Sequence, residues 1–266
     1  MTHRRYMAGG LVCLCLMWPA TSRGQQTQSQ PSSTPAAEAI DKDAMAALDK
    51  MGAYLRTLKV FQIRATTSRE TVLDDGQKIA LDGVVDLLVQ RPGRLWAEIS
   101  SDAQHRLFFF DGKTFTIFAR RMNYYATVPA PATLAELSER LANRYGIEVP
   151  LADLFYWGTE KSGASDVKSA MDVGPSQVEG VTCEHYAFRQ EGLDWQVWIQ
   201  NGDYPLPRKL LVTTTDDEAR PQYTSVLTWN LAPSFNDAAF TFVAPSDAHK
   251  IVLAELKEGG GDRDRR

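Results

Sequence analysis

Apolar and polar residues alternate along most of the chain, which predicts strands with one buried face. In the clearest case Val85, Leu87 and Val89 share a face, and the same parity ends at Arg91. The expected strands are Val60–Thr67, Ile79–Gln90, Leu95–Ser100, Arg106–Phe110, Thr114–Ala119, Tyr124–Val128, Met171–Val178, Val181–Arg189, Trp195–Ile199, Lys209–Thr215, Gln222–Asn230 and Ala239–Val243. Asp-Gly and Asn-Gly pairs between several of them are typical of hairpin turns.

Spacings of three and four residues predict two helices. The first carries a single apolar stripe, formed by Ile40, Ala44, Leu48, Met51, Leu55 and Leu58. The second begins at a capping box, Thr133 with Glu136, and ends at Gly146. The segment Leu151–Trp157 that follows is apolar nearly all round, which indicates either deep burial or contact with a ligand.

These elements predict one fold. An antiparallel sheet with one apolar face must cover that face, and the helices are the available cover. We therefore expect a mainly β (α+β) protein: a single strongly curved antiparallel sheet or half-barrel of about 11 strands, with an N-terminal helix and a central helical lid.

The first 24 residues have the pattern of a cleaved signal peptide. Arg4 and Arg5 precede an apolar run, Met7–Met17, and small residues surround a possible cut near Gly24. The alternatives are an uncleaved anchor, a lipid-modified N-terminus and the twin-arginine route. The run is shorter than a spanning helix requires, and the residues around Cys13, Cys15 and the arginine pair match the other two signals poorly.

The rest of the chain is expected to be one exported domain with flexible ends. Residues 25–38, rich in Gln, Ser, Thr and Pro, predict a disordered linker, residues 39–253 the folded domain and residues 254–266 a disordered tail. Such a protein would lie in the periplasm without stable insertion into the membrane.

Charge and cysteine content narrow the function. Cleavage after residue 24 lowers the count of Lys and Arg from 29 to 26 against 33 Asp and Glu, a net charge of −7. This balance argues against nucleic acid or an anionic membrane surface as the main partner. Cleavage would leave Cys183 as the one cysteine, so no internal disulfide is expected.

The usual motifs of hydrolases, zinc proteases and nucleotide-binding proteins are absent from the sequence. Cys183 and His185 share one face of an expected strand and could form a thiol–imidazole pair or two metal ligands, but a structural role is favoured. Asp74-Asp75 and Asp216-Asp217 fit turns better than a calcium loop. We therefore expect no enzyme activity, no cofactor and no metal.

Several short motifs resemble the periplasmic lipoprotein carrier superfamily. They are the segment from Gly83 to Arg91-Pro92, the turn Asp111-Gly112-Lys113-Thr114 and the C-terminal segment Asp237–Pro245. With Leu151-Ala-Asp-Leu-Phe155 and Tyr204-Pro-Leu-Pro-Arg208, the pattern is similar to a predicted periplasmic family of unknown function within that superfamily.

The resemblance implies a half-open barrel whose helices close a hydrophobic cavity for acyl chains. It also implies that Arg91, the arginine of the Arg-Pro motif, bonds to the lid and keeps it shut until cargo arrives. The inward parity names the residues that would line the cavity: Phe61, Ile63, Val85, Leu87, Val89, Leu95, Ile99, Leu107, Phe109, Phe115 and Ile117, with Leu137, Leu141, Leu154 and Phe155 from the lid. A filled core has the same composition, so both interpretations stay open.

We therefore predict a periplasmic protein that binds a hydrophobic small molecule or acyl chain, as a possible lipid or lipoprotein carrier. A membrane-associated protein partner is compatible with this function. The alternative is a periplasmic sensor or protein-interaction module with a filled core and no ligand.

Overall fold

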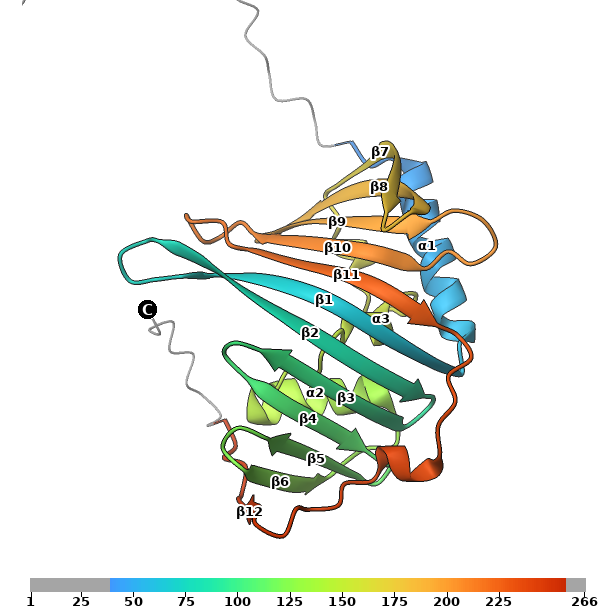
Figure 1. The fold of residues 1–266 in the computed structure, drawn as a ribbon. Coiled ribbons are helices and arrows are strands. Elements are labelled where there is room, and N and C mark those ends of the chain that lie inside the picture. The colour runs from blue at the N-terminus through green and yellow to red at the C-terminus, as the bar shows by residue number, and fades with distance from the viewer. Residues whose placement is uncertain (1–38, 257–266) are drawn as a thin grey trace, which may run out of the picture. The chain divides into compact units, whose positions relative to one another are not determined.

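Twelve strands form one open sheet in the computed structural model, which describes residues 39–256 (Figure 1). The strands are β1 (Val60–Val72), β2 (Lys78–Gln90), β3 (Arg94–Ser101), β4 (His105–Phe110), β5 (Thr114–Ala119), β6 (Tyr124–Pro129), β7 (Ser169–Val178), β8 (Val181–Gln190), β9 (Leu193–Gln200), β10 (Pro207–Thr214), β11 (Gln222–Asn230) and β12 (His249–Lys250). Their order across the sheet is β12-β6-β5-β4-β3-β2-β1-β11-β10-β9-β8-β7. All neighbours are antiparallel except β12, which runs parallel to β6.

The curved, mainly antiparallel sheet that the alternation predicted is confirmed, and it is not closed into a barrel. The predicted signal peptide (1–24) and linker (25–38) lie outside the described residues, as does the predicted tail beyond Leu256.

Three helices lie on the same side of the sheet, which we call its inner face: α1 (Lys42–Thr57), α2 (Leu134–Tyr145) and α3 (Asp153–Tyr156) (Figure 1). The predicted stripe of α1 is buried at Ala44, Leu48, Met51 and Leu55, whereas Ile40 is half exposed. The capping box of α2 forms as expected, because the Thr133 hydroxyl accepts a hydrogen bond from the Glu136 amide. Gly146 adopts the left-handed conformation that ends this helix.

The buried residues of neighbouring strands lie opposite one another in the sheet. Ile63 pairs with Leu87, Leu87 with Ala97, and Ala97 with Phe108. Since paired residues point to the same side of a sheet, their side chains form one apolar surface. The exposed fraction is 0% for Ile63, Leu87 and Ala97, so the surface is fully covered at these positions.

The predicted strand Ala239–Val243 is wrong. Its first residues belong to a short 3₁₀ turn, η2 (Asp237–Phe240), and the rest crosses the opposite, outer face of the sheet. The ring of Phe242 packs there against Phe109, Phe118 and Tyr125, with ring centroids 5.0 to 5.5 Å apart. Alternating aromatic residues thus pack onto the sheet instead of extending it, and the pairing with β6 is made further on, by β12.

The C-terminal segment then returns to the helices. Glu255 forms an ion pair with Arg144 of α2, with 2.6 Å between Oε1 and Nη2, and the Leu256 amide donates to the Arg144 carbonyl. Contacts of the folded unit therefore extend past the predicted boundary at Leu253.

Part of the free edge of β7 is occupied by the chain's own groups. The Ala170 amide donates to the Ala39 carbonyl, and the Asp172 amide donates to the Asp41 carboxylate at 3.4 Å. One step further the Gly174 amide donates to the Asp172 side chain at 2.8 Å. Pro175 follows and has no N–H to offer.

Two glycines let the chain after α3 rest directly on α1. A Cβ atom built on Gly52 of α1 would lie 2.6 Å from the Gly158 nitrogen, closer than non-bonded atoms approach. Gly158 follows α3 and has a φ of +75°, a conformation that favours glycine. The contact of α3 with α1 therefore depends on the absence of a side chain at both positions.

This contact predicts the sign of a substitution. Helix propensity alone would make Gly52→Ala stabilising by about 0.5–1 kcal/mol. Because the new methyl group meets the Gly158 backbone, we expect the free energy of unfolding to fall by about 1–3 kcal/mol in urea titrations. The exposed neighbour Ala53→Gly measures propensity alone and should lose about 0.5–1 kcal/mol. A Gly52→Ala variant more stable than the parent protein would refute the close contact.

Candidate functional site

The inner face of the sheet and the helices on it form one continuous set of buried apolar side chains, which we call the inner-face cluster. Most residues predicted to line a ligand cavity belong to it and are at most 4% exposed: Phe61, Ile63, Val85, Leu87, Val89, Leu95, Phe115, Leu137, Leu141, Leu154 and Phe155. Ile99 and Ile117 are partly buried and pack against the cluster. The structure thus brings these residues together, in contact with one another.

Leu107 and Phe109 were predicted to face inward, but they lie on the outer face. The register pairs Phe110 with Leu95 and Phe108 with Ala97, which places the even-numbered residues of β4 inside. Phe108 and Phe110 are 1% and 0% exposed, while Phe109 contacts Phe242 on the outer face. All residues from Leu107 to Phe110 are apolar, so the sequence of this strand has no alternation from which to read the parity.

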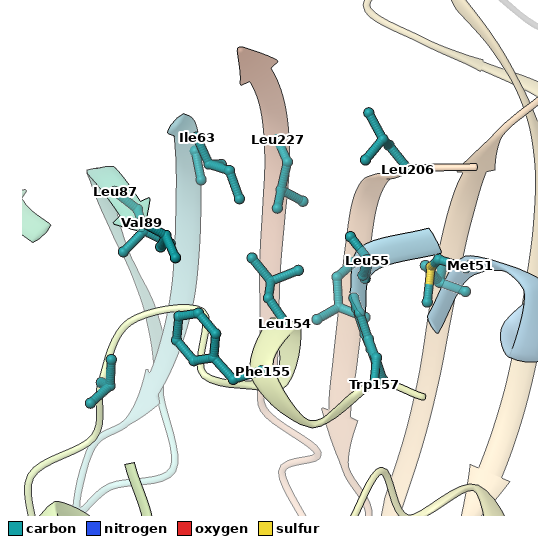
Figure 2. Packing of buried hydrophobic residues seen from close by; sticks show 14 of the residues in the cluster. Met51, Leu55, Ile63, Leu87, Val89, Leu154, Phe155, Trp157, Leu206 and Leu227 are labelled. Carbon is teal, nitrogen blue, oxygen red and sulfur yellow. The ribbon is translucent and has the colours of Figure 1, made fainter. Parts of the chain in front are cut away.

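The short helix α3 occupies the centre of the inner face. Figure 2 shows Leu154 and Phe155 pointing toward the sheet, where Ile63, Val89 and Leu227 point back toward them, and Trp157 beside Leu55 of α1. Leu154 and Phe155 are each 3% exposed and Trp157 is 8% exposed. The apolar character of Leu151–Trp157 is therefore explained, in this structure, by burial.

Arg91 follows the last residue of β2 and continues the series of inward-facing positions Val85, Leu87 and Val89. Its side chain reaches α3. Its Nη2 donates to the Leu154 carbonyl at 3.3 Å, and its guanidinium carbon lies 6.0 Å from the ring centre of Phe61 and 5.7 Å from that of Phe155. The Nε atom is buried and has no hydrogen-bond partner. Burial lowers the pKa of the Arg91 guanidinium from its usual value, because a charged group loses hydration in apolar surroundings.

The residues after Arg91 bind the start of α2. The Leu134 amide, the first of α2, donates to the Pro92 carbonyl at 3.1 Å. Gly93 lies so close to the Ala132 carbonyl that a Cβ atom would come within 2.2 Å of its oxygen. The turn between β2 and β3 therefore contacts both helices that cover this part of the sheet.

Sequence reasoning missed the other half of the inner-face cluster, which comes from β8 to β11 and the loop before β10. Its members include Tyr186, Phe188, Trp195, Val197, Ile199, Leu206, Leu210 and Leu227. The alternation in β9 contained the signal, since Trp195, Val197 and Ile199 share one parity. The cluster is consequently wider than the one predicted from the first six strands.

Cys183 and His185 do not form a reactive pair in the described part of the chain. The Cys183 thiol donates to the Val181 carbonyl at 3.5 Å and lies in a small outer-face cluster with Val178 and Trp198. His185 stacks on Trp198 at 3.9 Å and shares a 2.9 Å hydrogen bond with Gln196. Burial raises the pKa of the thiol and lowers that of the imidazole, which favours the neutral form of both.

The described residues 39–256 contain no group of three or more His, Cys, Asp or Glu side chains that could hold a metal ion. No helix within that range is both long enough and apolar enough to cross a membrane.

Two hollows in the surface of the described fold differ in position, and only the smaller one borders the inner face. One of about 750 Å³ is lined mainly by outer-face residues of β1, β2, β3 and β11, among them Thr66, Asp82 and Thr224. A smaller one of about 160 Å³ lies between α1 and the ends of β8 and β9, beside Lys50 and Gln200. Outside this smaller hollow, α1, α2 and α3 pack against the apolar side chains of the inner face.

Solved structures that match this chain have little sequence identity to it. An uncharacterized conserved protein from Thermus thermophilus is 11% identical, with a TM-score of 0.46 and coverage of 79% of this chain and 99% of that one. The lipoprotein LppX of Mycobacterium tuberculosis is 12% identical, with a TM-score of 0.46 and coverage of 74% and 100%. A LolA superfamily protein of Nitrosomonas europaea is 13% identical, with a TM-score of 0.30 and coverage of 75% and 97%.

No curated protein matches the sequence. A family model described as "Predicted periplasmic protein (DUF2092)" matches residues 44–254, which covers nearly all of the described fold. This match confirms the resemblance to a predicted periplasmic family that the sequence motifs indicated. The chain belongs to the DUF2092 family of predicted periplasmic proteins.

Proposed function

We propose that this protein is a periplasmic, non-enzymatic carrier or binding protein for a hydrophobic ligand, such as a lipid or an acyl chain. The observation that carries the proposal is the bond from Arg91 to the Leu154 carbonyl, which holds a helix of only four residues in the centre of an apolar sheet face. In this proposal the structure is the closed state. Displacement of α3 then opens a trough beneath it.

The free energy that an acyl chain gains on burial is similar to the free energy that α3 gains from its buried side chains, so a ligand could replace α3. Burial of three large apolar side chains, here Leu154, Phe155 and Trp157, contributes about 5–9 kcal/mol. An acyl chain contributes about 0.8 kcal/mol per methylene, so a dozen methylenes supply about 10 kcal/mol. A ligand of that length can therefore replace the contacts of α3 without polar recognition along its chain.

The family description supports a periplasmic location, as does the charged and then apolar start of the sequence. The residues proposed to contact the ligand are the inward residues of β1, β2, β3 and β5 together with Leu137, Leu141, Leu154 and Phe155. Leu107 and Phe109 are left out because they face outward.

A second candidate is a sensor or protein-interaction module without a ligand. The observation in its favour is the filled inner face, because the buried residues already satisfy one another. In that case α3 is a permanent part of the core.

Native mass spectrometry of the protein purified from periplasm separates the two candidates. We expect an added mass that is lost after solvent extraction and restored by incubation with a lipid extract. Heat-denatured and refolded protein, extracted in the same way, controls for surface adhesion. A protein that carries no added mass before or after incubation would favour the interaction module.

The latch role of Arg91 predicts a local change in stability. Arg91→Leu keeps apolar contact with Phe61 and Phe155 but leaves the Leu154 carbonyl without its donor. We expect the α3 amides of Phe155 and Trp157 to exchange hydrogen about tenfold faster, while β1 and β2 amides keep their rates. Arg94→Leu is the matched control, since Arg94 lies on the outer face and pairs with Asp237 at 2.8 Å. Equal exchange in Arg91→Leu and the parent protein would rule out a latch.

A further inference from the structure

The Arg91 guanidinium is a partly buried cation with few partners. Among the described residues, no carboxylate lies within ion-pair distance of it, and its one hydrogen bond is the 3.3 Å contact to Leu154. Its Nε is buried without a partner. Partial burial of an ion without a counter-ion costs free energy, and an anion that pairs with the guanidinium would offset this cost.

The surroundings stabilise the positive charge only in part. The rings of Phe61 and Phe155 lie on the guanidinium at 6.0 and 5.7 Å, within the range of cation–π attraction. A phenylalanine ring attracts a cation but accepts none of its conventional hydrogen bonds. The site therefore offers charge and directed N–H donors together, next to a large apolar surface.

The unused donors have a defined shape. Nε and Nη2 form one edge of the planar guanidinium, and two parallel N–H groups on such an edge match the two oxygens of a carboxylate or phosphate. In Arg91 the Nε atom of this edge has no hydrogen-bond partner. The Nη2 atom of the same edge makes only a long hydrogen bond, 3.3 Å, to the neutral Leu154 carbonyl. A charged oxygen would be a stronger acceptor than the Leu154 carbonyl it replaces.

We infer that the ligand of the inner face is an anionic amphiphile, whose carboxylate or phosphate pairs with the Nε and Nη2 edge of Arg91 while its chain lies along the inner-face cluster. This inference rests on the proposed function and specifies the ligand class. Head-group binding also explains release of α3, because the anion takes the donor that holds the Leu154 carbonyl. Entry of the ligand and opening of the lid are then one event.

Binding of four matched dodecyl compounds tests the head group. Isothermal titration calorimetry, below the micellar concentration of each compound, compares dodecanoate, dodecyl phosphate, dodecanol and dodecyltrimethylammonium. We expect either anion to bind about tenfold or more tightly than dodecanol, and dodecyltrimethylammonium to bind more weakly than dodecanol. The tighter of the two anions identifies the preferred head group.

Substitutions assign the preference to Arg91. In Arg91→Gln the affinity ratio of anion to dodecanol should fall to about one, and in Arg91→Lys it should be partly retained, because the ammonium keeps the charge but not the fork. Arg94→Gln, three residues further on at the start of β3 and on the outer face, should keep the parent ratio. A general loss of packing would weaken all four ligands alike and leave the ratio unchanged.

The binding results distinguish failure of the anionic-ligand inference from failure of the proposed function. If dodecanol binds the parent protein as tightly as the anions, the anionic ligand is excluded while the hydrophobic binding function stands. If none of the four compounds binds, both fail. The parent ratio decides the question even if Arg91→Gln does not fold.

Discussion

The fold depends on one constraint: an open sheet with an apolar face has to be covered along its whole width. No disulfide assists, since Cys183 is the single cysteine of the described residues and is free. Cover comes from α1 over one part of the sheet, α2 over another and α3 between them (Figure 1). Hydrophobic burial therefore determines where every helix lies.

The three covering helices are not equivalent. α1 and α2 have 16 and 12 residues with side-chain caps at their N-termini and amphipathic stripes, so each has local reasons to be helical. α3 has four residues and no side-chain cap, and its place depends on tertiary contacts. These are the apolar side chains it inserts, the Gly52–Gly158 contact and the bond from Arg91. The helix with the least local support, α3, is thus the one that lies at the centre of the inner face.

Much of this arrangement could be predicted from the sequence, because its signals are local. The parity of Val85, Leu87 and Val89 identified the inner face, and Thr133 with Glu136 identified the start of α2. Where local signals were absent, prediction failed. The four apolar residues Leu107 to Phe110 fit either parity, and only pairing with β3 decides between them.

The C-terminal segment illustrates a second limit. Alternation in Ala239–Val243 is compatible with a strand, but also with a chain that packs its aromatic rings onto a finished sheet. The two-residue strand β12 has no pattern of its own and exists because it meets β6. The latch candidate Arg91 was recognised from a motif, whereas its unpartnered Nε and its two aromatic neighbours became visible only in three dimensions.

The partly occupied edge of β7 has a consequence for the protein as a solute. An open sheet could in principle recruit a strand from a neighbouring molecule and polymerise. Here successive donors at Ala170, Asp172 and Gly174 are already engaged within the chain, and Pro175 has none. From Ala170 to Pro175 of the described chain, these four positions therefore offer a neighbouring strand no free backbone donor, which makes this stretch of the edge a poor template for strand addition.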